Sequence, residues 1–250
     1  MRYKLSILQN GRWIILDTTK GVNGSGQVVH YPVSPTVKVM SFETKQQAKE
    51  ACKELNKMES KMNKLLKHLK TIRTHRKYVR QMCFKVGLYW QGLVHDLSKY
   101  SIKELMMCKY WDGTKSPHQS CRDKIGYSPS WLNHYHKNKH HWEYWLDDDD
   151  VGTFIPIKMP YKYVIESFCD RVGASKAYNP KDWKPEILLK YWNEKCVGKN
   201  NMHPCTMDFM TELIHKLVLL GEDEFFKWYK ENRKELEIKY NSMKVNKESK

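Results

Sequence analysis

The chain has 250 residues, of which 40% are hydrophobic, and this size suits one large domain or a domain with a small appendage. Its nine tryptophans and fifteen tyrosines argue against disorder, and its seven cysteines form no Cys-x-x-Cys pair, which favours buried or half-buried free thiols. No apolar run approaches the roughly 20 residues of a membrane span, and the N-terminus lacks the features of a signal peptide. We therefore expect a cytoplasmic protein that does not cross a membrane.

The net charge of +16 at pH 7 is concentrated in the middle of the chain. Residues 1–60 carry +4, residues 61–145 carry +12, and residues 146–250 carry no net charge. A positive field around a pocket draws in anionic substrates, phosphates above all. A solvated basic surface, or non-specific affinity for nucleic acid, is the alternative explanation.

Residues 1–60 are predicted to form a separate small α+β module. Tyr3–Leu8 and Trp13–Thr18 are rich in strand-forming residues and are joined by an Asn-Gly turn, which is typical of a hairpin. Val37–Phe42 is predicted to be a third strand, and a helix follows it. The glycine-rich segment Gly21–Gly26 precedes a strand-like run instead of a helix, so a hairpin loop is favoured over a phosphate-binding loop.

From residue 61 to residue 250 the pattern predicts an all-helical domain. Apolar residues recur at three- and four-residue steps along the first helix as far as Gly87, and His75 lies on this inward stripe. The opposite stripe, over residues 61–80, is basic and contains no acidic residue. Further helices are predicted near residues 90–99, 101–111, 131–145, 160–175, 184–196, 205–220 and 222–240.

Local signals define the segments between these helices. Ser101 and Glu104 form a Ser-x-x-Glu capping box, which marks the start of a helix. Residues 112–129 contain two glycines and two prolines and are predicted to form a loop. The acidic run Asp147–Asp150 is also predicted to lie in a loop.

Histidines and aspartates of the helical region have the composition of a transition-metal site. His95 and Asp96 are adjacent, and because neighbouring helical side chains diverge by about 100°, they can meet one metal only near a helix end or a distorted turn. Asp170 falls in an apolar helix, where a metal or a salt bridge to a buried cation must offset the cost of an unpaired carboxylate. The candidate metal ligands are His75, His95, Asp96, His134, His140, His141 and Asp170.

The histidine-rich segment leaves several assignments open. Four histidines occur in the eight residues 134–141, and we expect at least two of them to bind metal. His134 and His140 can face the same side of a helix, whereas His136 would point elsewhere. His68 and His75 lie seven residues apart on nearly the same face, and the position of His75 on the inward stripe favours it as the ligand. A purely structural role for these histidines is the alternative.

At this point the residues resemble a known superfamily. The order His75, His95-Asp96 and Asp170 along the chain resembles the H … HD … D signature of the HD-domain metal-dependent phosphohydrolases. The segment His95–Lys99 is similar to the His-Asp-x-Gly-Lys of the HD-GYP cyclic-dinucleotide phosphodiesterases, with a serine at the glycine position.

Two later segments extend the resemblance. His140–Trp145 is similar to the double-histidine motif of the HD-GYP proteins, without the Gly-Tyr-Pro that follows it there, and Cys169–Ser175 is similar to the stretch around their last aspartate. Residues 65–220 as a whole resemble an uncharacterised family of HD-like proteins found in phages and their bacterial hosts. A phage-encoded chain would act in the host cytoplasm.

The resemblance implies an HD-type helical bundle with the activity of a metal-dependent phosphohydrolase on a nucleotide or cyclic nucleotide. The first metal would be held by His75, His95, Asp96 and Asp170. The second metal would be held by His134, His140 and His141, with Asp96 as the bridge. Asp96 and Lys99 would be the catalytic pair, with Lys99 on the substrate phosphate. Lys176 can reach the same phosphate, or is a plain surface lysine.

The number of histidine ligands favours Mn, Fe, Co or Ni over Mg, with one or two divalent metals per chain. Two other classes of protein remain open. HD-type di-iron oxygenases use the same ligand set and need oxygen and a reducible iron pair. A non-catalytic protein would bind nucleotides or nucleic acid through the basic stripe of residues 61–80, with a salt-dependent affinity that survives loss of the metal ligands.

Overall fold

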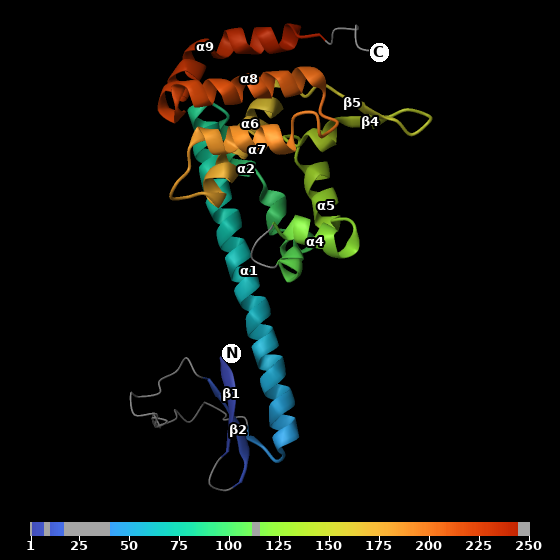
Figure 1. Ribbon diagram of the computed structural model, residues 1–250, viewed down its shortest axis with the longest axis vertical. Helices are drawn as coiled ribbons and strands as arrows, with labels where there is room; N and C mark the ends of the chain where they lie inside the picture. Colours follow the sequence, from blue (N-terminus) through green and yellow to red (C-terminus); the bar gives the residue numbers. More distant parts are fainter. Residues whose placement is uncertain (1, 8–10, 18–40, 112–115, 245–250) are drawn as a thin grey trace. The chain divides into compact units, whose positions relative to one another are not determined.

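The computed structural model describes residues 2–7, 11–17, 41–111 and 116–244. The chain divides into two compact units, Met1–Leu66 and Lys67–Lys250, and the long helix α1 (Lys45–Lys85) contributes to both. The fold is mainly α-helical with a small N-terminal sheet, as the sequence predicts (Figure 1).

The first unit contains a three-stranded antiparallel sheet in the order β1-β2-β3. Its strands are β1 (Tyr3–Ile7), β2 (Trp13–Asp17) and β3 (Ser41–Phe42). α1 contacts the first strand through Cys52, whose Sγ donates to the Tyr3 carbonyl oxygen at 3.2 Å, and through Asn56, which bonds both backbone groups of Tyr3 at 3.1 Å each. The glycine-rich segment Gly21–Gly26 and most of the predicted third strand lie outside the described residues.

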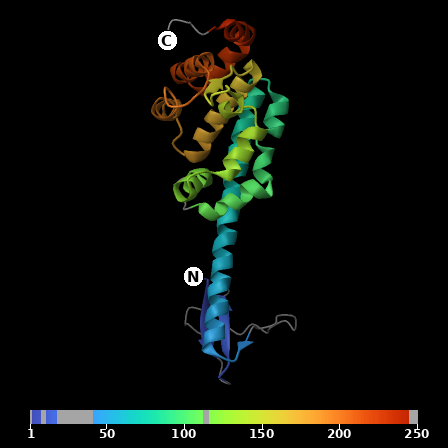
Figure 2. The same ribbon diagram turned by 90° about the vertical axis from the view of Figure 1, so that its right-hand side faces the viewer.

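The second unit is helical, and its core is formed by α1 and the C-terminal helices. The major helices are α6 (Tyr161–Tyr178), α7 (Pro185–Lys195), α8 (Pro204–Leu220) and α9 (Glu222–Ser242). In both views α8 and α9 lie side by side (Figures 1 and 2), with Phe209, Leu213 and Phe225 fully buried between the helices. These helices agree with the sequence prediction to within a few residues.

Short elements fill the segment between α1 and α6. They are α2 (Tyr89–Val94), the 3₁₀ helix η1 (Leu97–Tyr100), α3 (Ile102–Leu105), the 3₁₀ helix η2 (Met106–Tyr110), α4 (Pro117–Ile125), α5 (Pro129–Lys137), the 3₁₀ helix η3 (Trp142–Trp145), β4 (Leu146–Asp148) and β5 (Phe154–Pro156). The prediction of a loop over residues 112–129 is wrong, because α4 occupies most of the described part. Ser116 caps α4 by accepting from the Gln119 amide, and Gly126 ends it with a positive φ.

Two more predictions need correction. The single helix predicted over residues 131–145 is two elements, because α5 ends at Lys137 and the chain turns before η3. The acidic run Asp147–Asp150 is not a simple loop: β4 and β5 pair as an antiparallel hairpin, and Asp149 stabilises its turn by accepting from the amides of Val151 and Thr153. The carboxylate of Asp149 is thus committed to its own backbone.

A close approach of α1 to α6 positions the candidate site. A Cβ atom added to Gly173 would lie 2.5 Å from Val79 Cγ2 and 2.9 Å from the Val79 backbone nitrogen, so only glycine fits there. His75 is one turn before Val79 on α1, and Asp170 is about one turn before Gly173 on α6. The contact therefore brings these two side chains together.

All seven cysteines are buried free thiols, which confirms the expectation from their spacing. None of the helices in the described part of the chain has the length and apolar character that a transmembrane span requires.

Candidate metal centre

The centre is built around a turn at the end of α2. α2 ends at Val94. Two residues later, Asp96 has a φ of 55°, which is the left-handed conformation that aspartate tolerates better than most residues. Among the described residues, Asp96 is the only one other than glycine with a positive φ. Arg76 holds this turn: its Nε donates to the carbonyl oxygen of His95 at 2.8 Å, and its Nη2 donates to that of Leu93 at 3.0 Å. Adjacent side chains thereby converge, with His95 Nε2 3.3 Å from Asp96 Oδ2.

The first ligand group joins three elements. His75 Nε2 from α1 lies 3.1 Å from Asp96 Oδ2 and 3.1 Å from Asp170 Oδ1, and His95 Nε2 lies 3.2 Å from the same Asp170 oxygen. Ligand atoms of these four residues all lie within 4.8 Å of one another. This spacing allows one metal ion to bind all four.

The second ligand group uses the other oxygen of Asp96. Asp96 Oδ1 lies 3.2 Å from His134 Nε2 and 3.5 Å from His140 Nε2, and His141 completes a group within the same 4.8 Å limit. The break after α5 makes this possible, because the turn returns His140 and His141 toward His134 instead of carrying them along a straight helix. Asp96 therefore belongs to both groups.

Four atoms of the second group are buried without a hydrogen-bond partner. They are Asp96 Oδ1 and the Nε2 atoms of His134, His140 and His141. A buried polar atom without a hydrogen bond costs about 1–3 kcal/mol, and within the group only the close approaches of His134 Nε2 and His140 Nε2 to Asp96 Oδ1 offset this cost. A cation bound among the four atoms would satisfy all of them. Imidazole nitrogens and a carboxylate oxygen are transition-metal ligands. The residues present therefore fit a divalent metal.

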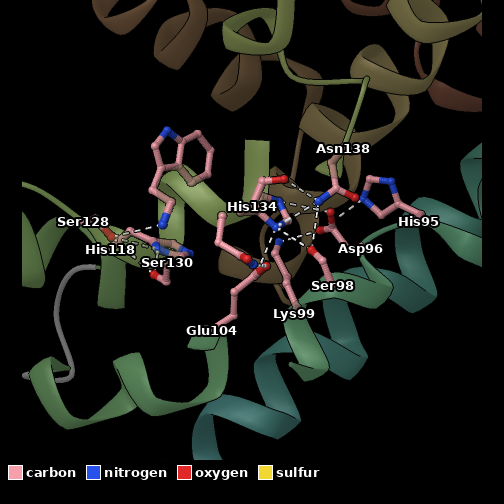
Figure 3. A network of polar contacts seen from close by, with 12 residues as sticks. His95, Asp96, Ser98, Lys99, Glu104, His118, Ser128, Ser130, His134 and Asn138 are labelled. Carbon is pink, nitrogen blue, oxygen red and sulfur yellow. Dashed lines mark hydrogen bonds and ion pairs between the residues drawn. The ribbon is translucent and has the colours of Figure 1, made fainter. Parts of the chain in front are cut away.

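Two buried glutamates, Glu104 and Glu166, orient the histidines, and neither is among the site residues predicted from the sequence. Glu166 Oε1 accepts from His95 Nδ1 at 3.1 Å and lies 3.2 Å from His140 Nδ1. Glu104 Oε2 accepts from His134 Nδ1 at 2.9 Å (Figure 3). A proton held on Nδ1 leaves the Nε2 lone pair free for a metal. The glutamates thus fix the tautomer that metal binding needs.

The capping-box prediction for Ser101 and Glu104 is wrong. Ser101 precedes α3 but makes no side-chain cap bond. Glu104 points into the interior, where it also accepts from Asn133 Nδ2 at 2.9 Å. A tertiary contact with a buried histidine has replaced the local one.

Surrounding cations stabilise the carboxylates in their charged form. Burial alone would raise the pKa of Asp96, but His95, Lys99 and His134 outweigh it and hold that pKa well below the usual range. Burial would likewise raise the pKa of Asp170, and hydrogen bonds from His75 and His95 lower it well below normal. Both aspartates are therefore ionised near neutral pH, as metal ligands must be.

The histidines of the centre fall into two kinds by the direction in which their pKa values are shifted. Burial, reinforced by neighbouring histidines, lowers the pKa of His140 and His141, so both imidazoles are neutral near pH 7. Burial opposes the charged form of His95 and His134 as well, but the negative charge of Asp96 outweighs it and raises their pKa values. A metal that binds through Nε2 therefore has to displace protons that these two rings hold more tightly than a free imidazole does.

Lys99 lies beside the cluster and Lys176 does not. Lys99 Nζ is 2.5 Å from Asp96 Oδ2, and its side chain keeps 21% exposure. Lys176 is ion-paired with Glu222 of α9 and packs over the rings of Tyr78 and Trp183, so the expectation that it reaches substrate phosphate is not supported by its contacts.

The remaining histidines of the sequence analysis stay outside the two groups. His136 is exposed and packs against Tyr135, in agreement with the expectation that it points elsewhere. His68 is half-buried, and His75 provides the ligand atom from α1.

The comparisons with known proteins give one match. A family described as a family of unknown function, DUF5662, matches residues 64–216, which is more than half of the chain and contains every residue of both ligand groups. No curated protein and no solved structure matches the chain.

Proposed function

Because the chain belongs to the DUF5662 family, whose function is unknown, we propose from its site that it is a metal-dependent phosphohydrolase acting on a nucleotide or cyclic nucleotide. The observation that carries this proposal is the set of four buried ligand atoms without a hydrogen bond, namely Asp96 Oδ1 and the three histidine Nε2 atoms beside it. The order of the ligands along the chain, and its resemblance to the HD-domain phosphohydrolases, supports the choice of reaction.

The ligand set suits one or two divalent transition metals, with Mn, Fe, Co and Ni as the candidates. A metal held there would lower the pKa of a bound water and polarise a phosphoryl oxygen. Asp96 would align the two ligand groups through its two oxygens, and the two glutamates would keep the histidine rings in place.

Lys99 supports an anionic substrate. It is the cationic side chain nearest to Asp96 and is partly exposed, so its ammonium group can neutralise charge on a phosphoryl oxygen next to the ligands. The charge of +12 over residues 61–145 would raise the local concentration of phosphate-bearing molecules. These features favour a phosphate ester over a neutral substrate.

The first test is elemental analysis of freshly purified protein beside an Asp96→Asn variant. Asparagine keeps the left-handed conformation accessible, so this change removes the shared charge with little cost to the turn; Asp208→Asn, on α8, is the matched control. We expect one or two metal equivalents in the wild type and the control and no bound metal in Asp96→Asn, with the circular dichroism spectrum unchanged.

Activity is then measured as phosphate release from a panel of nucleotides and cyclic nucleotides by the metal-loaded proteins. Release by the wild type that disappears in Asp96→Asn supports the proposal. Full activity in that variant, or absence of metal from the wild type after reloading, would refute it. Iron together with oxygen uptake and no phosphate release would instead identify an HD-type di-iron oxygenase.

A further inference from the structure

A cavity of about 710 Å³ lies beside the metal-ligand cluster. His95, His140 and Glu166 of the centre line it, together with Ser98 and Asn138. Asn138 Nδ2 donates to Ser98 Oγ at 2.9 Å and to the His134 carbonyl oxygen at 2.7 Å, so the cavity wall is bonded to the second ligand group. A volume of this size is typical of sites for small organic molecules.

Three lysines line the same cavity: Lys137, Lys139 and Lys162. All three are exposed, and the ammonium groups of Lys139 and Lys162 lie 6.0 and 4.8 Å from the centroid of one ring, that of Tyr163, so both cations border the same side chain. Among the described residues no carboxylate forms an ion pair with any of the three. Glu166, the acidic residue of the lining, is already occupied by two histidines.

Helix stability does not explain the position of Lys162. It lies in the first turn of α6, where a cation opposes the helix dipole. Like charges brought together without a counter-ion are also unfavourable. An anion bound between them would offset both costs.

Aromatic residues at the cavity can contact the organic part of a ligand. Trp90 lines the cavity with 70% of its surface exposed, and Tyr163 lies under the lysines. A large exposed ring beside a cavity can pack against an organic ligand. Lys99, by contrast, is not part of this lining, so the cavity is distinct from the face on which Lys99 would hold a reacting phosphate.

We propose that this cavity is a binding subsite for a phosphate group at a distance from the metals, which selects small organic molecules that carry at least two separate phosphates. Lys137, Lys139 and Lys162 bind this second phosphate, and Trp90 packs against the organic part. The identification of the ligand as the substrate rests on the proposed function, whereas the binding itself does not.

The test is calorimetric titration of the full-length protein with three matched probes: adenosine 3′,5′-bisphosphate, adenosine 5′-monophosphate and adenosine. The proteins are the wild type, the triple variant Lys137→Gln/Lys139→Gln/Lys162→Gln, and Asp96→Asn. A control triple variant, Lys181→Gln/Lys195→Gln/Lys230→Gln, has the same net charge as the cavity variant but changes exposed lysines of the same unit.

We expect the bisphosphate to bind the wild type most tightly and to lose at least about tenfold in affinity in the cavity variant, since charge-assisted contacts are removed. The control variant should lose less than about twofold. Asp96→Asn, which removes the metals that would hold the other phosphate, should bind the bisphosphate more weakly but retain the part of the affinity that depends on the three lysines. Equal losses in both triple variants would show non-specific attraction, and complete loss of binding in Asp96→Asn would place both phosphates on the metals; either result, or no binding to the wild type, overturns the subsite. Because the readout is binding, this failure is separate from a failure of the proposed activity.

Discussion

Replacing Glu104 by glutamine tests whether the buried glutamates control metal binding. Glu104 Oε2 accepts from His134 Nδ1 at 2.9 Å, and its other oxygen accepts from Asn133 Nδ2 at 2.9 Å. The carboxylate is 2% exposed, so no water replaces these contacts readily. Glutamine keeps the shape of the side chain but removes its charge and one acceptor, and so weakens the bond that keeps the proton on Nδ1.

The expected effect is confined to the second ligand group. Loss of a hydrogen-bond partner of a metal-binding histidine lowers metal affinity by about 10–100-fold, which corresponds to about 1.4–2.7 kcal/mol of binding free energy. His134 belongs to the second group only, whereas the first group takes its histidines from His75 and His95. Of two metals bound per chain, Glu104→Gln should therefore weaken one and leave the other within about threefold.

The assay is a competition titration with a chelator of known affinity, followed by elemental analysis of the protein. Glu222→Gln is the matched control, because it makes the same chemical change at a carboxylate that is bonded to lysines away from the centre. An unchanged affinity in Glu104→Gln, or equal weakening of both metals, would refute the assignment of Glu104 to the second group.

Three further predictions concern pH and packing. Because the pKa values of His95 and His134 are raised, a metal ion must displace protons from these rings in order to bind. The metal affinity should therefore fall by up to about tenfold per displaced proton for each pH unit of acidification. Competition with a chelator at several pH values measures this dependence. Burial and the charge of Lys99 lower the pKa of His118 to about 3. In the unfolded chain the His118 imidazole takes up a proton near pH 6.5, whereas in the folded protein it stays neutral down to about pH 3. The free energy of unfolding should therefore decrease as the pH falls from 6.5 toward 3, by up to about 1.4 kcal/mol per pH unit. His118→Gln should flatten this pH dependence in urea unfolding, and an unchanged pH dependence would contradict the prediction. Gly173→Ala should destabilise the protein by about 1–3 kcal/mol, because the new Cβ meets both the side chain and the backbone of Val79; Val79→Ala in the same chain should restore part of the loss, and a neutral Gly173→Ala would show that α1 and α6 can separate.

The sequence was informative where local geometry limits the options. His95 and Asp96 can share a metal only at a helix end, and the structure ends α2 at Val94 and places Asp96 in the left-handed conformation. The apolar repeat that carries His75 likewise predicts a buried position, and the residue is 7% exposed. In these cases the spacing of residues along one helix or turn determines the outcome.

The sequence was misleading where a local pattern competes with a tertiary contact. Ser101 and Glu104 match a capping box, yet Glu104 gains more from a buried histidine 30 residues away than from a backbone amide. Pro117 and Gly126 favour a loop by composition, but proline at the first helical position and glycine after the last one also delimit a helix, here α4. Glu166 had a usable signal, because it precedes Asp170 by four residues and so faces the same side of α6.

The charges of the centre bear on how many metals it holds. Its four buried or nearly buried carboxylates are those of Asp96, Glu104, Glu166 and Asp170. Lys99 offsets one negative charge, and without metal the raised pKa values of His95 and His134 favour positive charges on these two rings. If neutral histidines bind one divalent ion, the centre keeps a formal charge of about −1, which repels a phosphate; two divalent ions bring it to about +1, which attracts one. By this count the proposed phosphohydrolase would attract a phosphate only with two metals bound, and Asp96, whose two oxygens face the two ligand groups, is the residue through which occupancy of one would affect the other.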